Sequence, residues 1–342
     1  MDKLKSRALI IGCASTGLSV NEVQLFSKMN PWGLILFKRN CESPDQIRQL
    51  IKSFRAAVGR ADAPVFVDQE GGRVQRLGPP HWRKYPEARA LGHLYNINPA
   101  LALRTARNLG RLMAQELEEV GFTSDCLPVL DVPQPGAHDV IGNRAYEVRP
   151  ERIMVLANAH MAGLMDGGIL PVMKHIPGHG RASVDSHHGL PAVTASRMDL
   201  ESIDFVPFTG LAHCPMAMTA HVIYAAIDPD APATLSRKVV RHVIRRVIGF
   251  NGLLITDDLS MKALSGSMAE KAARAYEAGC DMLLHCNGVI EEMEEVAACA
   301  VEINAKTARR AKAALKLKRK PQPFDEKQAL GDLEAIMSTQ RA

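Results

Sequence analysis

The chain has 342 residues, of which 46% are hydrophobic and 23% charged, the balance of a globular protein with a substantial core. A formal charge of +5 is small for this length and does not by itself indicate a nucleic-acid-binding protein. Seven scattered cysteines without a CxxC pair argue against both a disulfide framework and a cysteine zinc cluster.

The N-terminal segment carries three basic residues before a short apolar run that ends at Cys13, an arrangement similar to a lipoprotein cleavage site. The run from Ala8 to Gly12 is shorter than the roughly 7–15 residues of a signal-peptide core, and it is more typical of a buried first strand. No stretch of about 18 apolar residues is present to span a membrane. We therefore expect a cytoplasmic protein without a membrane partner.

Short apolar runs alternate with longer helical patterns through most of the chain. The runs are nearly continuous in apolar residues, as in parallel strands buried on both faces. The predicted strands are Ala8–Ala14, Gly33–Phe37, Pro64–Val67, Cys126–Leu130, Ile169–Met173, Met216–Thr219, Gly252–Thr256 and Asp281–His285. The helical patterns between them include Pro99–Val120, Glu151–Gly167, Ser236–Ile248 and Met268–Ala278. Eight strands alternating with helices predict a (β/α)8 TIM barrel in a single domain.

A doubly wound open sheet is the alternative α/β fold. No GxGxxG opens a helix after a predicted strand, as a dinucleotide-binding sheet would require. Gly71-Gly72 follows the third strand, but Pro79-Pro80 breaks the segment where a phosphate-binding helix would have to begin. The barrel is therefore favoured.

The chain continues beyond the last strand as a tail. We predict a barrel over residues 1–304 and a helical tail over 305–342 that packs on the barrel or extends from it. The stretch Ala305–Lys320 is rich in Lys and Arg but lacks interleaved aromatic residues, so a solvated helix face is favoured over a nucleic-acid site. The expected partner is a small-molecule substrate, with no nucleic acid, and the protein is expected to be a monomer.

Polar residues stand at the ends of five predicted strands: Asp68, Asp131, Lys174-His175, His221 and Asp257-Asp258. The carboxyl ends of barrel strands meet at one rim, where the loops build the active site. A single aspartate there would be explained equally well as a helix N-cap. Five polar ends on one rim predict an active site.

The segment Lys174–His188 is the densest polar cluster of the chain. It contains four of the twelve histidines, Asp185, and two glycines that could act as hinges, Gly178 and Gly180. A polar surface loop, a metal site and acid/base catalysis are the three interpretations. Barrel metallohydrolases carry HxH after the first strand and Asp after the last, whereas this chain has Ser15-Thr16 and Asn287 near those places. This difference argues against a metal, and no cofactor is expected.

Asp185 and His187 are two residues apart, so in an extended segment both side chains project to the same side. A neighbouring carboxylate raises the pKa of a histidine and fixes its tautomer, as required of a general acid that later acts as a base. Asp257, facing a cationic Lys174, would remain ionised and available as a nucleophile. A carboxylate nucleophile and a separate proton donor are the two catalytic groups of a retaining glycosidase, although the usual donor is a second carboxylic acid.

Several ordered motifs resemble the bacterial β-N-acetylglucosaminidases of glycoside hydrolase family 3, of the NagZ type. They cover most of the chain from about residue 8 to 290. The motifs are VDQEGGRVQR (Val67–Arg76), PVLDV (Pro128–Val132), GNRAY (Gly142–Tyr146), KHIPGHG with DSH (Lys174–Gly180, Asp185–His187) and ITDDLSM (Ile255–Met261).

The resemblance implies a role for each matching position. Asp257 corresponds to the nucleophile, His187 to the acid/base, and Asp185 to the residue that orients it. The positions that correspond to sugar-binding residues are Asp68, Arg76, Arg144, Lys174 and His175. In the family the substrate is a terminal non-reducing β-GlcNAc, typically of GlcNAc-1,6-anhydro-MurNAc peptides in cytosolic peptidoglycan recycling, and no metal or cofactor is used.

Two features depart from the family pattern. Arg181 stands where the family often has Asp, which changes the charge of the catalytic loop. No second α/β sandwich domain follows the barrel, as in many members, and a one-domain form agrees with a cytoplasmic enzyme. The alternative functions are phosphorolysis, which some members perform, a metal-dependent barrel hydrolase, and a non-catalytic sugar-binding module.

Overall fold

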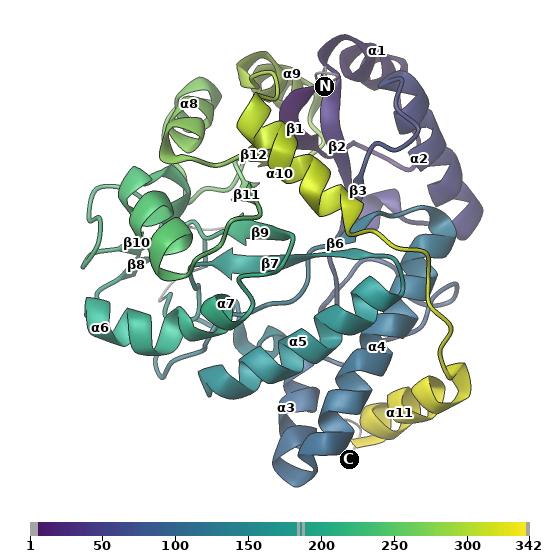
Figure 1. The fold of residues 1–342 in the computed structure, drawn as a ribbon. Coiled ribbons are helices and arrows are strands. Elements are labelled where there is room, and N and C mark those ends of the chain that lie inside the picture. Colours follow the sequence, from purple (N-terminus) through teal and green to yellow (C-terminus); the bar gives the residue numbers. More distant parts are fainter. Residues whose placement is uncertain (1–5, 183–184, 187–188, 340–342) are drawn as a thin grey trace.

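The computed structural model describes residues 6–182, 185–186 and 189–339, and within them eight parallel strands close into a barrel (Figure 1). In order around the barrel the strands are β1 (Arg7–Ile11), β2 (Pro31–Leu36), β3 (Val65–Val67), β6 (Ser124–Asp125), β7 (Leu170–Ile176), β9 (Met216–Thr219), β11 (Leu253–Asp258) and β12 (Met282–His285). β12 pairs with β1 and closes the ring. The predicted (β/α)8 TIM barrel is confirmed, and the doubly wound alternative is wrong.

Helices surround the barrel (Figure 1). The α-helices are α1 (Val20–Met29), α2 (Pro44–Ala57), α3 (Ala88–Ile97), α4 (Pro99–Val120), α5 (Pro150–Asp166), α6 (Arg197–Asp199), α7 (Val206–Gly210), α8 (Met268–Ala278), α9 (Ile290–Cys299), α10 (Ala305–Lys316) and α11 (Glu326–Thr339). Two π-helices (Leu200–Asp204, Val239–Val247) and three 3-10 turns (Lys38–Asn40, Gly142–Arg144, Ala233–Leu235) complete the described helical elements. Two small sheets lie outside the barrel, one pairing β4 (Gln69–Gly71) with β5 (Val74–Gln75), the other β8 (Ala192–Val193) with β10 (Ile223–Tyr224).

The predicted helix Pro99–Val120 has the same first and last residues as helix α4, because each end carries a local signal in the sequence. The side chain of Asn98 accepts a hydrogen bond from the backbone N–H of Leu101 (3.0 Å), and Pro99 occupies the first helical position, where its missing N–H costs nothing. The helix ends at Gly121, whose φ of 98° is a conformation that glycine adopts without strain. These local signals act within a few residues, so the sequence alone locates both ends.

The predicted strand Cys126–Leu130 is wrong in its bounds, because the regular strand β6 covers only Ser124–Asp125. Pro128 has no N–H to donate to a ladder, which interrupts regular pairing. The segment still belongs to the barrel wall, because Val172 N–H donates to the Leu127 carbonyl (3.0 Å) and Leu130 N–H to the Lys174 carbonyl (2.7 Å). The neighbouring strand β7 extends to Ile176 and therefore includes the Lys174-His175 pair.

The barrel interior is filled by aliphatic, methionine and aromatic side chains, including Ile10, Phe66, Val172, Met216 and Leu253. Ala311 and Ala314 of α10 belong to the same buried cluster, so this helix packs on the barrel lumen. Figure 1 shows α10 crossing the end of the barrel nearest the viewer. The basic helix of the tail therefore covers one end of the barrel with its small residues.

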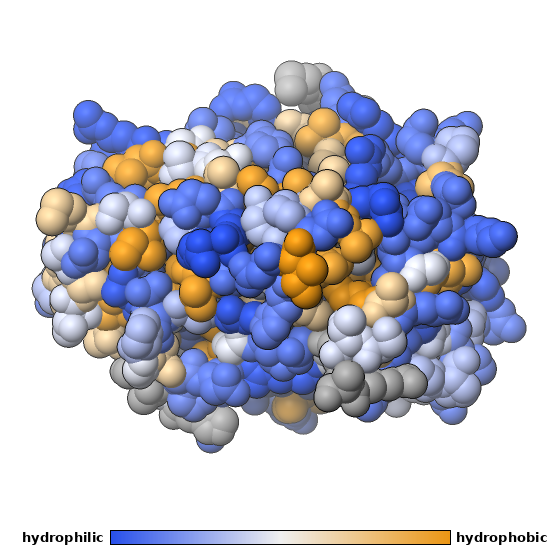
Figure 2. Space-filling model, turned by 90° about the horizontal axis from the view of Figure 1, so that it is seen from below, coloured by the Kyte–Doolittle hydropathy of each residue, from blue (hydrophilic) through white to orange (hydrophobic). Residues whose placement is uncertain are grey.

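Helix α11 packs against α4 (Figure 1), where Arg104 and Asp332 form an ion pair of 3.0 Å. On the face shown in Figure 2, hydrophilic residues cover most of the surface and hydrophobic residues are interspersed among them. In the described part of the chain, none of the helices combines the length and the apolar character needed to cross a bilayer.

Candidate active site

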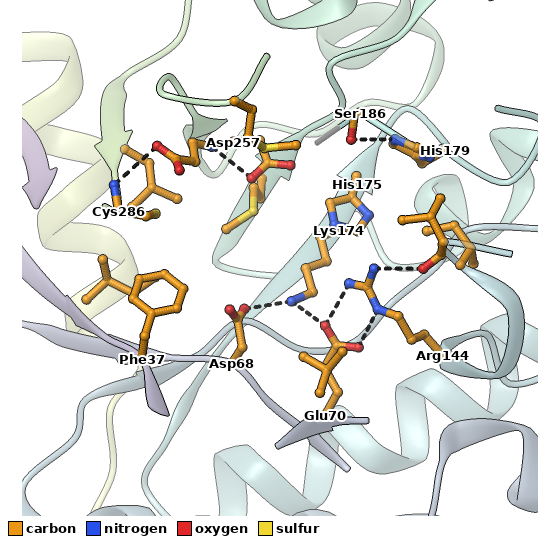
Figure 3. A pocket seen from close by; sticks show the side chains of 18 of the residues that line it. Phe37, Asp68, Glu70, Arg144, Lys174, His175, His179, Ser186, Asp257 and Cys286 are labelled. Carbon is orange, nitrogen blue, oxygen red and sulfur yellow. Dashed lines mark hydrogen bonds and ion pairs between the residues drawn. The ribbon is translucent and has the colours of Figure 1, made fainter. Parts of the chain in front are cut away.

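A cavity of about 170 Å³ opens among the carboxyl ends of the strands (Figure 3). Apolar side chains such as Phe37 and Met218 form part of its wall. The wall also contains six of the eight residues that the sequence assigned to the site: Asp68, Arg76, Arg144, Lys174, His175 and Asp257. Asp185 is half-buried and is not among the lining residues, and His187 lies outside the described residues.

The ammonium group of Lys174 lies between the carboxylates of Asp68 and Glu70 in a buried ion cluster (Figure 3). Its Nζ is 2.8 Å from Oδ1 of Asp68 and 2.6 Å from Oε1 of Glu70. Asp68 also accepts a hydrogen bond from Arg76 at 2.8 Å. Burial alone would raise the pKa of Asp68, but the charges and hydrogen bonds of Lys174 and Arg76 outweigh it and hold that pKa well below its usual value. Asp68 is therefore an ionised acceptor at neutral pH.

Glu70 is a member of this cluster that sequence reasoning missed. Its carboxylate forms two hydrogen bonds of 2.8 Å with the guanidinium of Arg144, in addition to the contact with Lys174. Burial opposes ionisation, but these two cations lower the pKa of Glu70 to about 2. The sequence did contain a pattern that indicates Glu70. It lies two residues after Asp68, and in an extended segment the two side chains can project to the same side.

Asp131, which follows another predicted strand, holds the backbone of the segment Lys174–His188 in place. It is fully buried and accepts hydrogen bonds from the backbone N–H of His175 (3.2 Å) and of His179 (2.6 Å). Its second oxygen lies 2.7 Å from Nδ1 of His175. Burial opposes ionisation here too, but His175 and His179 outweigh it, so the pKa of Asp131 is lowered. Asp131 thus orients the His175 ring without lining the cavity itself.

His179 lines the cavity and is neutral at physiological pH, because burial, reinforced by the neighbouring His175, lowers its pKa to about 4. Its Nε2 is 3.2 Å from the hydroxyl of Ser186 (Figure 3). The backbone carbonyl of Ser186 accepts a hydrogen bond from Ala263 (3.1 Å), in the segment that follows β11. Ser186 therefore contacts His179 within the loop and Ala263 outside it, and so connects the loop with the part of the rim that carries Asp257.

The two adjacent aspartates at the end of β11 have different environments. Asp258 accepts hydrogen bonds from the backbone N–H of Ser260 (3.0 Å), the hydroxyl of Ser260 (2.6 Å) and the backbone N–H of Cys286 (3.2 Å). Asp257 accepts one from the backbone N–H of Asp258 (2.8 Å), and its carboxylate faces the cavity in Figure 3. Both aspartates line the cavity; Asp258 also fixes the turn, whereas the carboxylate of Asp257 faces the cavity.

His221 was expected at the active rim because it ends a predicted strand. Its ring is fully buried, with Nδ1 2.7 Å from the hydroxyl of Thr234 and Nε2 3.0 Å from the carbonyl oxygen of Asp258. It is not among the residues that line the cavity. Both ring nitrogens are occupied within the protein, so His221 supports the turn beneath Asp257 and is not available to substrate.

The two glycines of the loop serve close packing. A Cβ atom on Gly180 would lie 2.1 Å from the carbonyl oxygen of Val132, a contact that no side chain tolerates. Gly178 has a φ of 140°, and its carbonyl oxygen accepts a hydrogen bond from the hydroxyl of Tyr224. The hydrogen bond from Gln134 N–H to the Gly180 carbonyl (3.1 Å) adds another fixed point. This part of the loop is docked on its neighbours.

Arg181, which departs from the family pattern, has a defined partner. Its Nε is 2.7 Å from Oδ2 of Asp204, a carboxylate that is only 2% exposed. Burial raises the pKa of Asp204 to about 6 even though Arg181 acts in the opposite direction. The arginine therefore anchors this part of the segment Lys174–His188 to the π-helix Leu200–Asp204.

Residues 15–317 match the N-terminal domain of glycosyl hydrolase family 3. A β-hexosaminidase of Alkalilimnicola ehrlichii is 43% identical over 283 residues, which cover 82% of this chain and 80% of the relative. A β-hexosaminidase of Pseudomonas aeruginosa is 39% identical over the same length, covering 82% of each chain.

Solved structures agree with the sequence relatives. NagZ of Neisseria gonorrhoeae in complex with N-trifluoroacetyl-D-glucosamine superimposes with a TM-score of 0.88 at 30% identity, covering 98% of this chain and 99% of that one. A family 3 β-N-acetylglucosaminidase of Paenibacillus sp. superimposes with a TM-score of 0.87 at 27% identity, covering 98% of this chain and 68% of that one.

The ion cluster predicts an acid-sensitive contribution to stability. The pKa of Glu70 is lower in the folded state than its ordinary 4.5, so its contribution is complete above pH 4.5 and is lost as pH falls through about 2. Glu70→Gln should lower the free energy of unfolding at pH 7 by roughly 3–5 kcal/mol, because Lys174 and Arg144 lose a buried partner. It should also flatten the acid limb of the stability curve in urea unfolding. Glu119→Gln, the same change at an exposed position, is the control, and equal acid limbs in both variants would contradict the prediction.

The anchor of the loop predicts coupling between Arg181 and Asp204. Arg181→Ala and Asp204→Asn should each destabilise the protein, and the double variant should cost less than the sum because both remove one interaction. The expected coupling in a double-mutant cycle of unfolding free energies is roughly 0.5–3 kcal/mol. Additive effects would show that the pair contributes nothing.

Proposed function

The chain belongs to glycosyl hydrolase family 3 and is a β-N-acetylhexosaminidase, and from this premise we propose that it is a retaining exo-β-N-acetylglucosaminidase. The observation that carries the proposal is the position of Asp257, whose carboxylate faces the cavity while Asp258 is engaged in the turn. In this proposal residues 1–304 form the catalytic domain of a monomer, and the tail 305–342 supports it.

The proposed first step breaks the glycosidic bond. The Asp257 carboxylate attacks the anomeric carbon, the bond to the leaving oxygen breaks, and His187, oriented by Asp185, gives its proton to that oxygen. Water then attacks the same carbon as His187 removes its proton, the bond to Asp257 breaks, and GlcNAc is released with retained configuration. Substrate and one water molecule are the only other participants, so the reaction balances without an oxidant or a cofactor.

The buried ion cluster supports the assignment of the sugar subsite. Asp68 is an ionised acceptor, and Lys174 and Arg144 stay cationic because their carboxylate partners raise their pKa values above the usual range, although burial acts against it. Such fixed charges form strong hydrogen bonds to hydroxyl groups. We propose that Asp68, Arg76, Arg144, Lys174 and His175 bind the hydroxyls of a terminal GlcNAc.

The natural substrate and setting rest on the resemblance. We propose GlcNAc-1,6-anhydro-MurNAc peptides as substrates, cleaved in the cytoplasm during peptidoglycan recycling. One structural neighbour, NagZ of Neisseria gonorrhoeae, was solved in complex with N-trifluoroacetyl-D-glucosamine. We propose that this chain likewise binds a sugar with a 2-acylamino group.

Turnover of p-nitrophenyl β-GlcNAc tests the proposal. The wild-type protein should release p-nitrophenol and free GlcNAc, and Asp257→Ala should lose more than about 10³-fold in kcat because the adjacent carboxylate of Asp258 is held in the turn by Ser260. Equal unfolding midpoints would show that both proteins are folded. Full activity of Asp257→Ala contradicts the nucleophile assignment, and GlcNAc-1-phosphate as the main product in phosphate buffer identifies a phosphorylase instead.

His187 should matter most for poor leaving groups. His187→Ala should slow cleavage of a GlcNAc-MurNAc disaccharide by about 10²–10⁴-fold, since a sugar alkoxide needs protonation. An aryl glycoside with an acidic phenol should be affected much less in its glycosylation step. His188→Ala removes the neighbouring imidazole and is the matched control. Equal losses on both substrates would refute the proton-donor role.

A further inference from the structure

A second hollow, of about 800 Å³, lies at the other end of the barrel. Its lining residues Asn251 and Gly279 stand just before β11 and β12, whereas the catalytic cavity opens at the carboxyl ends of the strands. The walls come from the π-helix Val239–Val247, the end of α8 and the start of α10. Six cationic side chains line it: Arg237, Arg241, Arg245, Arg274, Lys306 and Arg310.

Two of these cations are fixed at the base of the hollow by one carboxylate. Asp281, 4% exposed, lies 2.9 Å from Arg245 and 3.0 Å from Arg310. Arg245 also donates to the carbonyl oxygens of Phe250 (3.0 Å) and Gly252 (2.9 Å). The single negative charge of Asp281 neutralises only one of the two guanidinium groups. The pair of Arg245 and Arg310 therefore keeps one net positive charge in a fixed position.

The other four cations have no ion pair within the residues that the structure describes. Arg241 and Arg245 are four residues apart on one helix, a spacing at which like charges repel and destabilise the helix. The pKa of Lys306 is lowered by its partial burial and by the charge of Arg310, a sign that positive potential there is not neutralised.

The charge of this hollow is most of the excess charge of the chain. Six cations face two carboxylates, Glu277 of the lining and Asp281 at the base, which leaves four positive charges against a formal +5 for the whole protein. Such a concentration costs folding energy in the absence of an anion and attracts one from solution.

We propose that this hollow is a binding site for a small anion that carries two or more phosphate groups. Guanidinium groups match phosphate oxygens in pairs, and three elements converge on a hollow of limited size. A nucleic-acid strand is less well matched, because single-strand sites stack bases on several aromatic rings. Tyr276 is the one aromatic lining residue in the described part, and its hydroxyl donates to the Ala8 carbonyl (2.9 Å).

Binding at this site would connect three elements that close the barrel. Lys306 and Arg310 belong to α10, the helix that packs on the lumen through Ala311 and Ala314. A ligand that bridges them to Arg241 stabilises the folded state by mass action. The site is remote from Asp257, so turnover does not depend on it.

Calorimetric titration with sodium tripolyphosphate at constant ionic strength tests the proposal on the full chain. We expect saturable binding of one equivalent, tighter than for inorganic phosphate, and a rise of the unfolding midpoint. Arg241→Ala combined with Lys306→Ala should weaken binding at least roughly tenfold, since each removes a charge-assisted contact. Arg246→Ala, an exposed position on the same helix outside the lining, is the matched control and should bind as the wild type does.

Two further measurements show whether the variants are folded and whether another ligand occupies the hollow. Unchanged turnover of the aryl glycoside in every variant shows that the proteins are folded, and this readout is independent of the hollow. The proposal is overturned if tripolyphosphate shows no saturable binding, or if Arg246→Ala weakens it as much as the double variant does. It is equally overturned if a single-stranded oligonucleotide or phosphatidylglycerol vesicles bind at these residues and tripolyphosphate does not displace them.

Discussion

The buried ammonium of Lys174 is the interaction on which the site depends. An unpaired charge at this depth would be prohibitively costly, so the barrel must supply carboxylates, and Asp68 and Glu70 do so from the segment that follows β3, two strands away from β7 in the barrel. Glu70 in turn fixes Arg144, which belongs to a segment more than 70 residues further along the chain. One burial requirement therefore orders several hydrogen-bonding groups before any ligand arrives, and such pre-organisation lowers the cost of binding.

The loop that follows β7 illustrates how a polar segment can be held on a rim. Asp131 accepts the backbone N–H groups of His175 and His179, and Gly180 fits against Val132 only because it has no Cβ. Arg181 extends this docking to a separate helix. The first half of the loop is thus fixed on two sides, which gives the proposed acid/base segment a rigid base from which to act.

The two ends of the barrel have different structures. Apolar side chains fill the lumen and α10 covers one end, so the polar cavity at the other end rests on a packed floor. The same arrangement places the basic side chains Lys306 and Arg310 beside the buried pair of Arg245 and Asp281. A helix that stabilises the barrel through small residues therefore also brings a concentration of charge to its outer surface.

The sequence by itself determined the barrel, the bounds of α4 and α8, and the set of polar residues at the strand ends, because periodicity, caps and glycine stops act over short distances. The motif resemblance pointed to Asp257 as the nucleophile, but the separate task of Asp258 in the turn could not be read from the sequence, since it arises from Ser260 and from Cys286, which directly follows β12. The inner role of His221 and the pairing of Arg181 with Asp204 likewise depend on segments that only folding brings together. Tertiary structure decided these points because a side chain's function is set by partners, burial and register, and those partners lie far away along the chain.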